Sequence, residues 1–462
     1  MSTAVQVLAP RRNFIDVDGV HPATDLGNAK RFVGDHGATV RYCPAKGKWL
    51  IWAGDHWRWD DMNLIVGLAQ DTVRRMLLDA VPDLNTCQTY ATHAVKSMSR
   101  SRIDAMLYLA QPHLSVRVED LDADPLLFNV ANGTLNLATG TLDEHDPAQL
   151  ITKLSPVAYD PNAECPLWLQ FLHDITSGDT ELAGYLQRAA GYSLTGSIVE
   201  HVLFMLFGSG INGKSTLVET LRHVCGDYAK ASDFSTFTQS KTSGPRNDLA
   251  MLCGARFVTA AESEDGKQLA ESFVKQVTGG DRITARFLYG EHFEFVPSFK
   301  LWLSTNFKPQ IRGTEEGIWR RIRLIPFVVR IADNKIDRQL GDKLKAEASG
   351  ILGWAVEGLR QYREGGLREP ASVLNATRAY RQEENAIARF ISACCVLQPS
   401  AKSPAHKFYD AFRRWAAQNG ETMMAEKKFS HCLGEHGLNA TRGTAGRFWQ
   451  GICLLSDRVD VA

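Results

Sequence analysis

Hydrophobic and polar positions repeat with different periods along the chain, and each period predicts a different kind of element. From residue 64 to about 111 the apolar residues recur at helical spacing, which predicts helices. From 128 to 146 short apolar runs are separated by glycine-containing turns, which predicts short strands. Residues 168–194 again have helical spacing, and a break at 177–179 divides them into two predicted helices. This part of the chain therefore predicts a mixture of helices and short strands.

A cluster of aromatic residues precedes these helices. Residues 31–60 contain Trp49, Trp52, Trp57 and Trp59. They flank Gly54-Asp55, a turn signal that predicts a small hairpin. Exposed aromatic rings can stack on nucleic-acid bases. We instead interpret the cluster as a small aromatic core, the more frequent role of tryptophans packed this densely.

Between residues 200 and 330 the pattern changes to short, continuous apolar runs. The runs are 201–207, 256–261, 300–305 and a fourth that ends at Pro326. Uninterrupted apolar runs of this length are typical of parallel strands that are buried on both faces. The pattern predicts an α/β core with a parallel sheet.

The first run leads directly into a phosphate-binding motif, G-x-x-x-x-G-K-S. Its glycines let the backbone wrap closely, so that N–H groups and the following helix N-terminus face phosphates. Lys214 supplies positive charge to the β and γ phosphates, and the Ser215 hydroxyl is a ligand for Mg²⁺. The predicted nucleotide-binding residues are Gly208, Ser209, Gly210, Ile211, Asn212, Gly213, Lys214, Ser215 and Thr216.

Polar residues also follow the second and third runs. Glu262 ends the second, where an open α/β sheet binds its ligand, and it is the predicted residue for orienting Mg²⁺ and the attacking water. Glu264 is the alternative, whereas Asp265 is a turn residue. Asn306 ends the third run and is predicted to hold the γ-phosphate or the water.

Three arginines precede the fourth run. Arginine's planar and permanently charged fork suits phosphate. In a ring ATPase one such group comes from the neighbouring subunit. Arg320 or Arg321 is predicted to be this trans-acting residue, and Arg323 to form structural salt bridges.

Composition narrows the class of protein. The 462 residues include 52 Lys and Arg and 52 Asp and Glu, so any contact with nucleic acid must depend on local charge. Nine scattered cysteines without a C-x-x-C pair argue against a zinc ribbon and a secreted disulfide framework. The N-terminus has no signal-peptide pattern and no apolar run is long enough for a membrane span. A cytoplasmic protein without a membrane partner is expected.

Two groups of residues contain side chains of the types that bind metals, but we do not interpret either group as a metal site. The acidic run Glu119 to Asp124 is interpreted as a solvated loop, because no strand pattern presents two of its carboxylates on one face. His431, Cys432 and His436 lack a completing pair at a suitable distance, which favours helix packing.

From about residue 128 to 330 the order of motifs resembles the superfamily 3 helicases of the phage and plasmid primase type, relatives of the poxvirus helicase-primase. The matching segments are 129–133, 165–166, 191–192, 208–215, 275–281, Arg286, Asn306 and 319–321.

The resemblance implies a hexameric ring of AAA+-like subunits that bind ATP between them and move 3′ to 5′ on single-stranded DNA. It places Lys275 in a DNA-facing loop, and predicts Arg286 and His292 as further DNA contacts on a hairpin over 283–296. Lys275 is the preferred contact, since an ordinary strand role for His292 is equally compatible with the sequence.

The predicted domains follow from these patterns and from the resemblance. They are an N-terminal accessory region (1–127), a helical collar (128–198), the ATPase core (199–335), a helical connector (336–380) and a winged-helix-like DNA-binding domain (381–462). In the last, basic residues outnumber acidic ones, which suggests contact with DNA.

The sequence therefore predicts an ATP- and Mg²⁺-dependent DNA helicase for replication of a phage, plasmid or other mobile element in a bacterial host. Its expected partners are single-stranded and forked DNA, further copies of itself and a primase or polymerase on another chain, because no primase signature is present. The alternative is an initiator or loader that uses ATP mainly to assemble.

Overall fold

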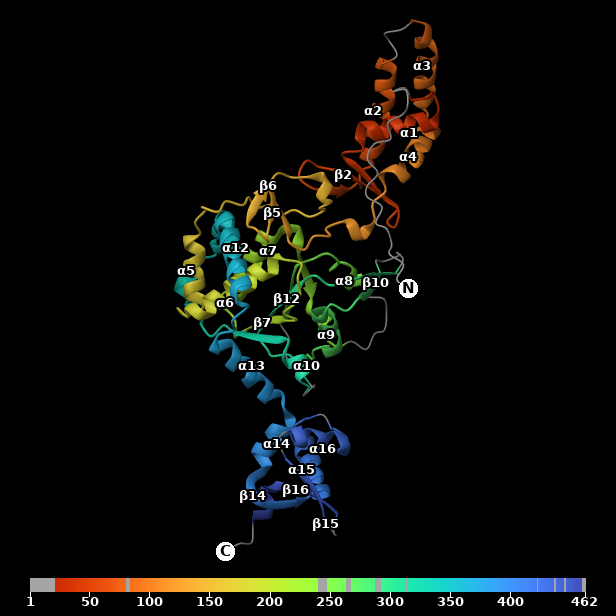
Figure 1. The fold of residues 1–462 in the computed structure, drawn as a ribbon. Helices are drawn as coiled ribbons and strands as arrows, with labels where there is room; N and C mark the ends of the chain where they lie inside the picture. Colours follow the sequence, from red (N-terminus) through yellow and green to blue (C-terminus); the bar gives the residue numbers. More distant parts are fainter. Residues whose placement is uncertain are drawn as a thin grey trace. The chain divides into compact units, whose positions relative to one another are not determined.

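A computed structural model describes residues 21–79, 84–239, 247–262, 267–286, 292–311, 315–421, 423–435, 438–443 and 446–458. The chain forms two compact units (Figure 1). The small unit comprises residues 1–124, 129–135 and 142–154, and the large unit comprises 125–128, 136–141 and 155–462. Each unit is described by itself.

The small unit combines helices with a three-stranded antiparallel sheet of order β1-β2-β3. Its elements are α1 (Asp25–His36), β1 (Val40–Cys43), β2 (Lys48–Trp52), β3 (Trp57–Trp59), α2 (Leu64–Asp79), α3 (Leu84–Ser97) and α4 (Arg100–Leu114). The predicted helices are confirmed, and the predicted hairpin gains a third strand. Trp57 is buried with Cys43 and Leu50, and Trp52 and Trp59 pack against them, which confirms the aromatic core.

Three short strands follow, with sheet order β4-β5-β6: β4 (Leu127–Val130), β5 (Gly133–Asn136) and β6 (Thr141–Asp143). Next come α5 (Pro166–Ile175) and α6 (Thr180–Leu194), separated at the predicted break. Pro166 begins α5, where its missing N–H costs no helical hydrogen bond. The Asp179 carboxylate accepts a hydrogen bond from the Leu182 N–H and so caps α6.

The core of the large unit is a five-stranded parallel sheet with strand order β13-β7-β12-β9-β8. The strands are β7 (Leu203–Phe207), β8 (Ala229–Asp233), β9 (Phe257–Glu262), β12 (Lys300–Thr305) and β13 (Ile322–Pro326). The predicted α/β core with a parallel sheet is confirmed. Since all five strands are parallel, their carboxyl ends meet at one edge of the sheet.

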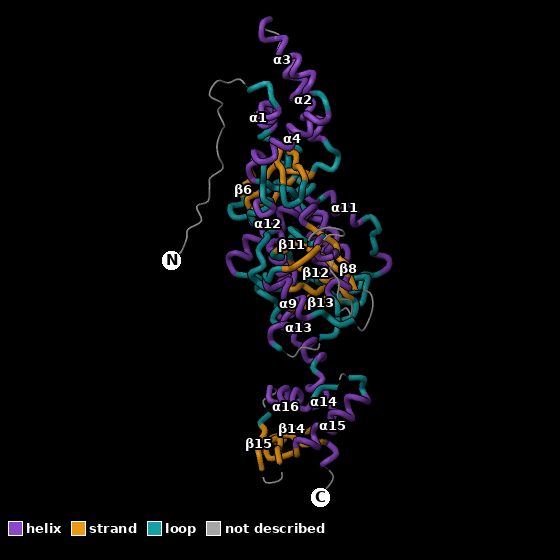
Figure 2. The backbone as a smooth tube through the Cα atoms, turned by 90° about the vertical axis from the view of Figure 1, so that its right-hand side faces the viewer, coloured by secondary structure: helices purple, strands orange, loops and turns teal. Residues whose placement is uncertain are grey.

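Helices cover both faces of this sheet (Figures 1 and 2). On one face, Trp302 lies 4.6 Å from Phe204, ring to ring, and donates a hydrogen bond from Nε1 to Ser193 of α6. On the other, Leu203 and Leu303 pack with Val274 of α9. Burial on both faces explains why the strands have no polar alternation.

The remaining helices and strands of this core are α7 (Lys214–Cys225), α8 (Asn247–Ala250), α9 (Glu271–Gly279), β10 (Ile283–Arg286), β11 (His292–Phe295), α10 (Glu316–Trp319), α11 (Leu340–Ala346), α12 (Ala348–Gly365) and α13 (Ala371–Glu384). The edge strand β13 is covered by α13, where the Thr377 hydroxyl accepts a hydrogen bond from the Leu324 N–H.

Residues 386–458, the C-terminal domain of the large unit, have their own core. The order of elements is α14 (Ala386–Cys394), β14 (Cys395–Pro404), α15 (Ala405–Gln418), α16 (Glu426–Glu435), β15 (Ala440–Gly443) and β16 (Gly446–Leu454). The sheet order is β14-β16-β15, and both pairs are antiparallel. Phe390, Phe408, Phe412 and Phe429 are buried in the core of this domain.

Within the described part of the chain, no helix is long and apolar enough to span a bilayer.

Candidate active site

The motif at residues 208–215 forms a tight loop between β7 and α7. Two of its glycines have steric reasons to be glycine. A Cβ on Gly208 would lie 2.3 Å from the Phe327 carbonyl oxygen, and one on Gly213 would lie 2.5 Å from Ile175 of α5. Gly213 also has a φ of +86°, a conformation that side chains disfavour. The loop is therefore fixed by its packing against α5 and the end of β13.

The Lys214 ammonium is the centre of a polar cluster at the carboxyl edge of the sheet. Its Nζ lies 2.6 Å from the Gly208 carbonyl oxygen, 3.1 Å from Asn212 Oδ1 and 3.2 Å from Asn306 Oδ1. These three acceptors match the three N–H donors of the ammonium. Lys214 is 5% exposed, and burial lowers its pKa. We call these four residues the Lys214 cluster.

Asn306 enters this cluster from a different strand. It follows β12, which pairs in parallel with β7, so Asn306 and the loop leave the sheet at the same edge. The structure thus brings Lys214 and Asn306 within hydrogen-bond distance, and the role of Asn306 at the γ-phosphate or the water stays a prediction. Asn212 was predicted only as part of the loop, yet it is 3% exposed and its Nδ2 also donates to the Phe327 carbonyl at 3.3 Å.

Of the predicted carboxylate residues, the backbone of Glu262 lies next to this edge. Glu262 is the last residue of β9, and its backbone pairs with Thr305 of β12. Its side chain is outside the described residues, as are Glu264 and Asp265. The backbone therefore puts Glu262 on the strand beside Asn306, and its role stays a prediction.

Ser215 and Thr216 open onto a groove along the outer side of α7. Ser215 is exposed, and the groove has a volume of about 580 Å³. Glu219, Thr220 and His223 of α7 line it, together with Gly341 and Lys345 at α11. Burial, followed by the charge of Lys345, lowers the pKa of His223. A polar groove that begins at the phosphate loop has the position and size for a nucleoside.

The two candidate trans-acting arginines lie at the opposite edge of the sheet, before β13 begins. The Arg321 Nε donates to Thr278 Oγ1 at 3.1 Å and its Nη1 donates to the Gly317 carbonyl, and the side chain is 9% exposed. Arg320 is exposed, and its guanidinium has no hydrogen bond or ion pair with the described residues. Arg323 forms a 2.6 Å ion pair with Glu369, as predicted. The structure therefore distinguishes a held arginine from a free one.

The segment predicted to be a DNA-facing loop is instead helical. Lys275 lies in α9, and its Nζ is 2.7 Å from Glu315 Oε2. Gly280, at φ +83°, follows the last residue of the helix and ends it. The loop prediction for Lys275 is wrong.

The predicted hairpin over 283–296 is confirmed, since β10 and β11 are antiparallel partners. Arg286 and His292 lie directly opposite each other at its end. The tip between them lies outside the described residues. Their contact with DNA stays a prediction.

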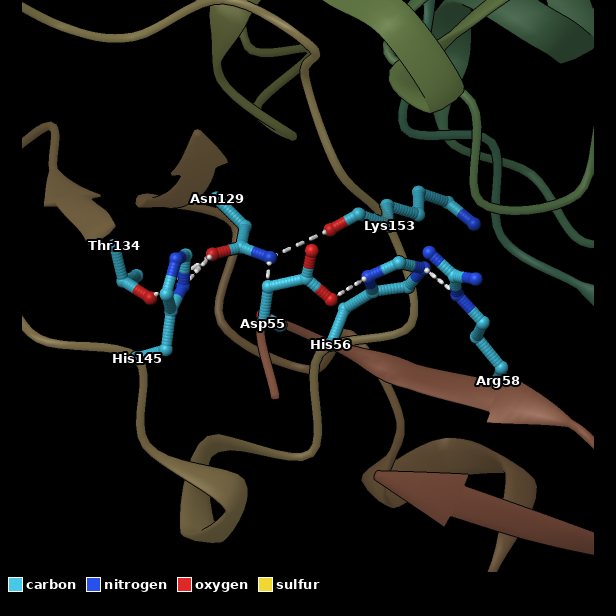
Figure 3. Close-up of polar contacts among 7 residues, drawn as sticks. All are labelled: Asp55, His56, Arg58, Asn129, Thr134, His145 and Lys153. Atoms are coloured by element: carbon cyan, nitrogen blue, oxygen red, sulfur yellow. Dashed lines mark hydrogen bonds and ion pairs between the residues drawn. The ribbon is translucent and has the colours of Figure 1, made fainter. Parts of the chain in front are cut away.

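A second polar cluster, in the small unit, explains the segment 129–133 (Figure 3). The Asn129 Nδ2 donates to the carbonyl oxygens of Asp55 and Lys153 at 2.9 and 3.0 Å. Its Oδ1 accepts from Thr134 Oγ1 at 3.2 Å and lies 3.0 Å from His145 Nδ1. Every hydrogen-bonding position of the carboxamide is used by the chain itself. This Asn129 cluster is a structural joint, which local sequence did not indicate.

Figure 3 also shows a chain of polar contacts from Asp55 through His56 to Arg58, beside the Asn129 cluster. The His56 Nδ1 lies 2.7 Å from Asp55 Oδ1, and the Arg58 Nε lies 3.1 Å from His56 Nε2. Because a guanidinium only donates, Nε2 is the acceptor and the proton of a neutral His56 is on Nδ1. His56 is 6% exposed, so this chain of contacts contributes to the fold.

Neither of the two groups with metal-binding types of side chain brings three ligands together within the described residues. Asp120 is bound by the Arg117 guanidinium, and Asp122 accepts hydrogen bonds from Thr152. Within the acidic run, residues 118–120 form a short 3-10 helix, and a turn follows at 121–122. Cys432 is buried in the core of the C-terminal domain, and His436 lies outside the described residues.

The sequence matches three protein-family profiles. Residues 29–177 match the "D5 N terminal like" family, residues 206–321 match a family of unknown function (DUF5906), and residues 382–449 match the "Poxvirus D5 protein-like" family. The phosphate loop, Asn306 and the arginine pair all fall within the second match.

Relatives come from large DNA viruses. A protein of Acanthamoeba polyphaga mimivirus, provisionally named a helicase, is 28% identical over 326 residues, which are 65% of this chain and 34% of the relative. A protein of African swine fever virus, provisionally named a primase, is 24% identical over 312 residues, 62% of this chain and 32% of the relative. The chain thus aligns with about a third of the length of these relatives. They are proteins of eukaryotic viruses, so an origin in a bacterial host stays a prediction.

The fold is similar to a solved structure, the A form apo structure of the NrS-1 C-terminal region. The TM-score is 0.52 at 9% sequence identity, over 92% of this chain and 98% of that one. The family profiles and the viral relatives support a D5-like superfamily 3 helicase-primase family for this chain.

Proposed function

We propose that the chain is an ATP-dependent DNA helicase that moves 3′ to 5′ on single-stranded DNA as a ring. The observation that carries the proposal is the Lys214 cluster. It joins a phosphate-binding loop to Asn306 from the neighbouring strand, within hydrogen-bond distance of one ammonium. ATP phosphates would replace the oxygen atoms that surround Lys214, and its charge would stabilise the oxygens of the transferred group.

Mg²⁺ fits this edge of the sheet. The Ser215 hydroxyl is exposed there, and Glu262 ends the strand beside Asn306. Hydroxyl and carboxylate oxygens are ligands that Mg²⁺ prefers. Ser215 and Glu262 would hold the ion, which neutralises phosphate charge when bound. Asn306 would orient the attacking water, and the groove along α7 would take the nucleoside.

A ring is supported by the distance between the two edges of the sheet. Arg320 precedes β13, whereas the loop lies beside the end of that strand, where the Phe327 N–H donates to the Phe207 carbonyl. Five residues of strand span roughly 16 Å. Arg320 therefore cannot serve the nucleotide of its own chain, and a second copy would have to supply it. Its exposed and unpaired state supports this role.

The C-terminal domain supports a DNA partner. Its element order, helix–strand–helix–helix–strand–strand, is the order expected of the winged-helix-like domain that we propose. We also propose that a primase or polymerase on a separate chain works with this protein. The DNA that they replicate would belong to a phage, a plasmid or another mobile element.

The test is ATP hydrolysis with and without single-stranded DNA, combined with strand displacement on forked duplexes that carry a 3′ or a 5′ tail. Stimulation by DNA and displacement from the 3′ tail are expected. Hydrolysis without displacement would instead favour an initiator or loader.

The ring requires a separate experiment. Lys214→Ala and Arg320→Ala chains, each inactive alone, should recover part of the turnover when mixed, because some interfaces then combine an intact loop with an intact arginine. No recovery in a mixture that still assembles would contradict action in trans.

A further inference from the structure

The hairpin formed by β15 and β16 carries two positive charges in direct opposition. Arg442 and Arg447 are cross-strand partners, and both side chains are exposed. Neither guanidinium has a hydrogen bond or an ion pair with the part of the C-terminal domain that the structure describes. Like charges directly opposite each other destabilise a strand pair. The hairpin therefore retains a repulsion that a bound anion would relieve.

Both arginines face the same side of the sheet as its core. Side chains alternate along β16, so Arg447 lies on the face of Trp449, which is 2% exposed and packs with α15 and α16. The Arg447 guanidinium is 5.5 Å from the centroid of the Trp449 ring. Stacking on an aromatic ring restricts the side chain before any ligand binds. The cationic pair is thus partly preorganised.

The surrounding domain adds positive charge. The exposed charges of α15 are Lys407, Arg413 and Arg414, against the single acid Asp410. One acid of the domain, Glu421, is already 2.7 Å from Arg389. Diffuse positive charge of this kind attracts a polyanion more than a single carboxylate.

The spacing of the pair fits a chain of phosphates. Directly paired residues of antiparallel strands have Cα atoms about 4.5–5.5 Å apart, and phosphates follow each other at about 3.4 Å of axial rise per strand. Two flexible arginine forks can therefore hold neighbouring phosphates, each with two hydrogen bonds.

We propose that Arg442 and Arg447 form a clamp for the sugar-phosphate backbone of nucleic acid, without preference for base sequence. The clamp rests on the proposed function, in which the C-terminal domain contacts DNA, and it names the two residues of that domain that hold the backbone.

The decisive variant is Arg442→Glu in the full-length chain. The new carboxylate would pair with Arg447 across the strands, so the unfolding midpoint should stay the same or rise. Binding of a fluorescein-labelled duplex of arbitrary sequence, followed by anisotropy, should weaken by about tenfold or more. The slope of log K against log salt should fall by roughly two, since both phosphate contacts are lost. A residue with only a structural role would not combine higher stability with weaker binding.

The matched control is Lys402→Glu. It makes the same change of charge in the same domain, but Lys402 pairs with Gln450 and so lies on the opposite face of the sheet from Trp449. It is exposed, and its replacement should change the affinity by less than about threefold. Equal weakening by both variants would show a general charge effect and overturn the clamp.

A second variant and two further measurements distinguish the remaining outcomes. If Arg442→Glu lowers the unfolding midpoint, the Arg442→Gln, Arg447→Gln chain replaces it, and unchanged affinity there overturns the proposal. A chain that binds anionic phospholipid vesicles through these arginines, and no DNA, would overturn it as well. DNA-free ATP turnover is measured in the same samples. Its absence would count against the proposed ATPase, whereas normal turnover with unaltered DNA binding by Arg442→Glu would count against the clamp alone.

Discussion

The Lys214 cluster and the Asn129 cluster both bring distant segments together around one buried polar side chain, but they differ in what satisfies it. Asn129 binds two main-chain carbonyls, from Asp55 and Lys153, and its own oxygen accepts two more bonds. Lys214 is surrounded by one loop carbonyl and two side-chain amide oxygens at the open edge of a sheet. The partners of Asn129 are fixed by the fold, whereas those of Lys214 can be exchanged for a ligand.

Because of this difference, we expect the Asn129 cluster to determine the stability of the fold and the Lys214 cluster to determine ATP turnover. A saturated joint whose removal orphans buried backbone groups should affect folding. A charged group that can change partners should affect turnover with little effect on the fold. Four sets of variants test the distinction.

The largest effect is expected from Lys214→Ala. Loss of the phosphate charge should lower ATP turnover by about 10²–10³-fold or more. The unfolding midpoint should change little, because the main chain of the loop packs against Ile175 and the Phe327 carbonyl independently of the Lys214 side chain. Steady-state hydrolysis and thermal unfolding measure the two effects. The exposed Lys48→Ala is the control, since its ion pair with Asp61 is solvent-screened. Retained hydrolysis in Lys214→Ala would remove the site assignment.

Arg320 and Arg321 are adjacent, yet one substitution should lower activity and the other should lower stability. Arg320→Ala should lower turnover by roughly 10³-fold while nucleotide still binds. Arg321→Ala should lower the free energy of unfolding by about 1–3 kcal/mol, because Thr278 and Gly317 lose their buried partner. Nucleotide titration and urea unfolding measure these effects. The opposite pattern would make Arg321 the trans-acting residue.

Asn129→Ala should act on the small unit alone. Two partly buried carbonyls and two donors lose their partner together, which should cost about 2–4 kcal/mol. Peptide-resolved hydrogen exchange should show faster exchange in residues 40–60, 129–135 and 142–154, whereas ATP turnover should stay within about twofold. Asn162→Ala, an exposed asparagine of the large unit, is the control. Unchanged exchange would show that the joint contributes little to stability.

The smallest effect is expected from Thr134→Val, which removes one of the four bonds of the same joint. Thr134 is 2% exposed, and its hydroxyl donates to Asn129 Oδ1. The free energy of unfolding should fall by about 0.5–1.5 kcal/mol. Urea unfolding followed by circular dichroism can resolve it, and a loss as large as that of Asn129→Ala would mean that the valine disturbs the packing as well.

Much of the ATPase core could be predicted from the sequence. The apolar runs gave the strands β7, β9, β12 and β13 nearly to the residue. Because those strands are parallel, the residues that follow each one meet at a common edge, which brought Asn306 to Lys214. The helices on either side of the break at 177–179 followed from apolar periodicity in the same way.

The errors and omissions have a common origin. The family resemblance placed Lys275 in a loop, yet Lys275 lies in a helix that the buried side chains Val274 and Val277 hold against the sheet. Asn129 gave no local sign that it joins four segments, because its partners are up to 74 residues away in the sequence.

By itself, the sequence determined the phosphate loop, the order of the strands along the chain and the placing of the arginine pair before the last of them, because periodicity and motif are local properties. Only the tertiary structure decided which arginine is held and which is free, that Lys275 is paired with Glu315, and that Arg442 faces Arg447. Those facts depend on which distant side chains meet, and spacing along the chain does not encode the partners of a charge.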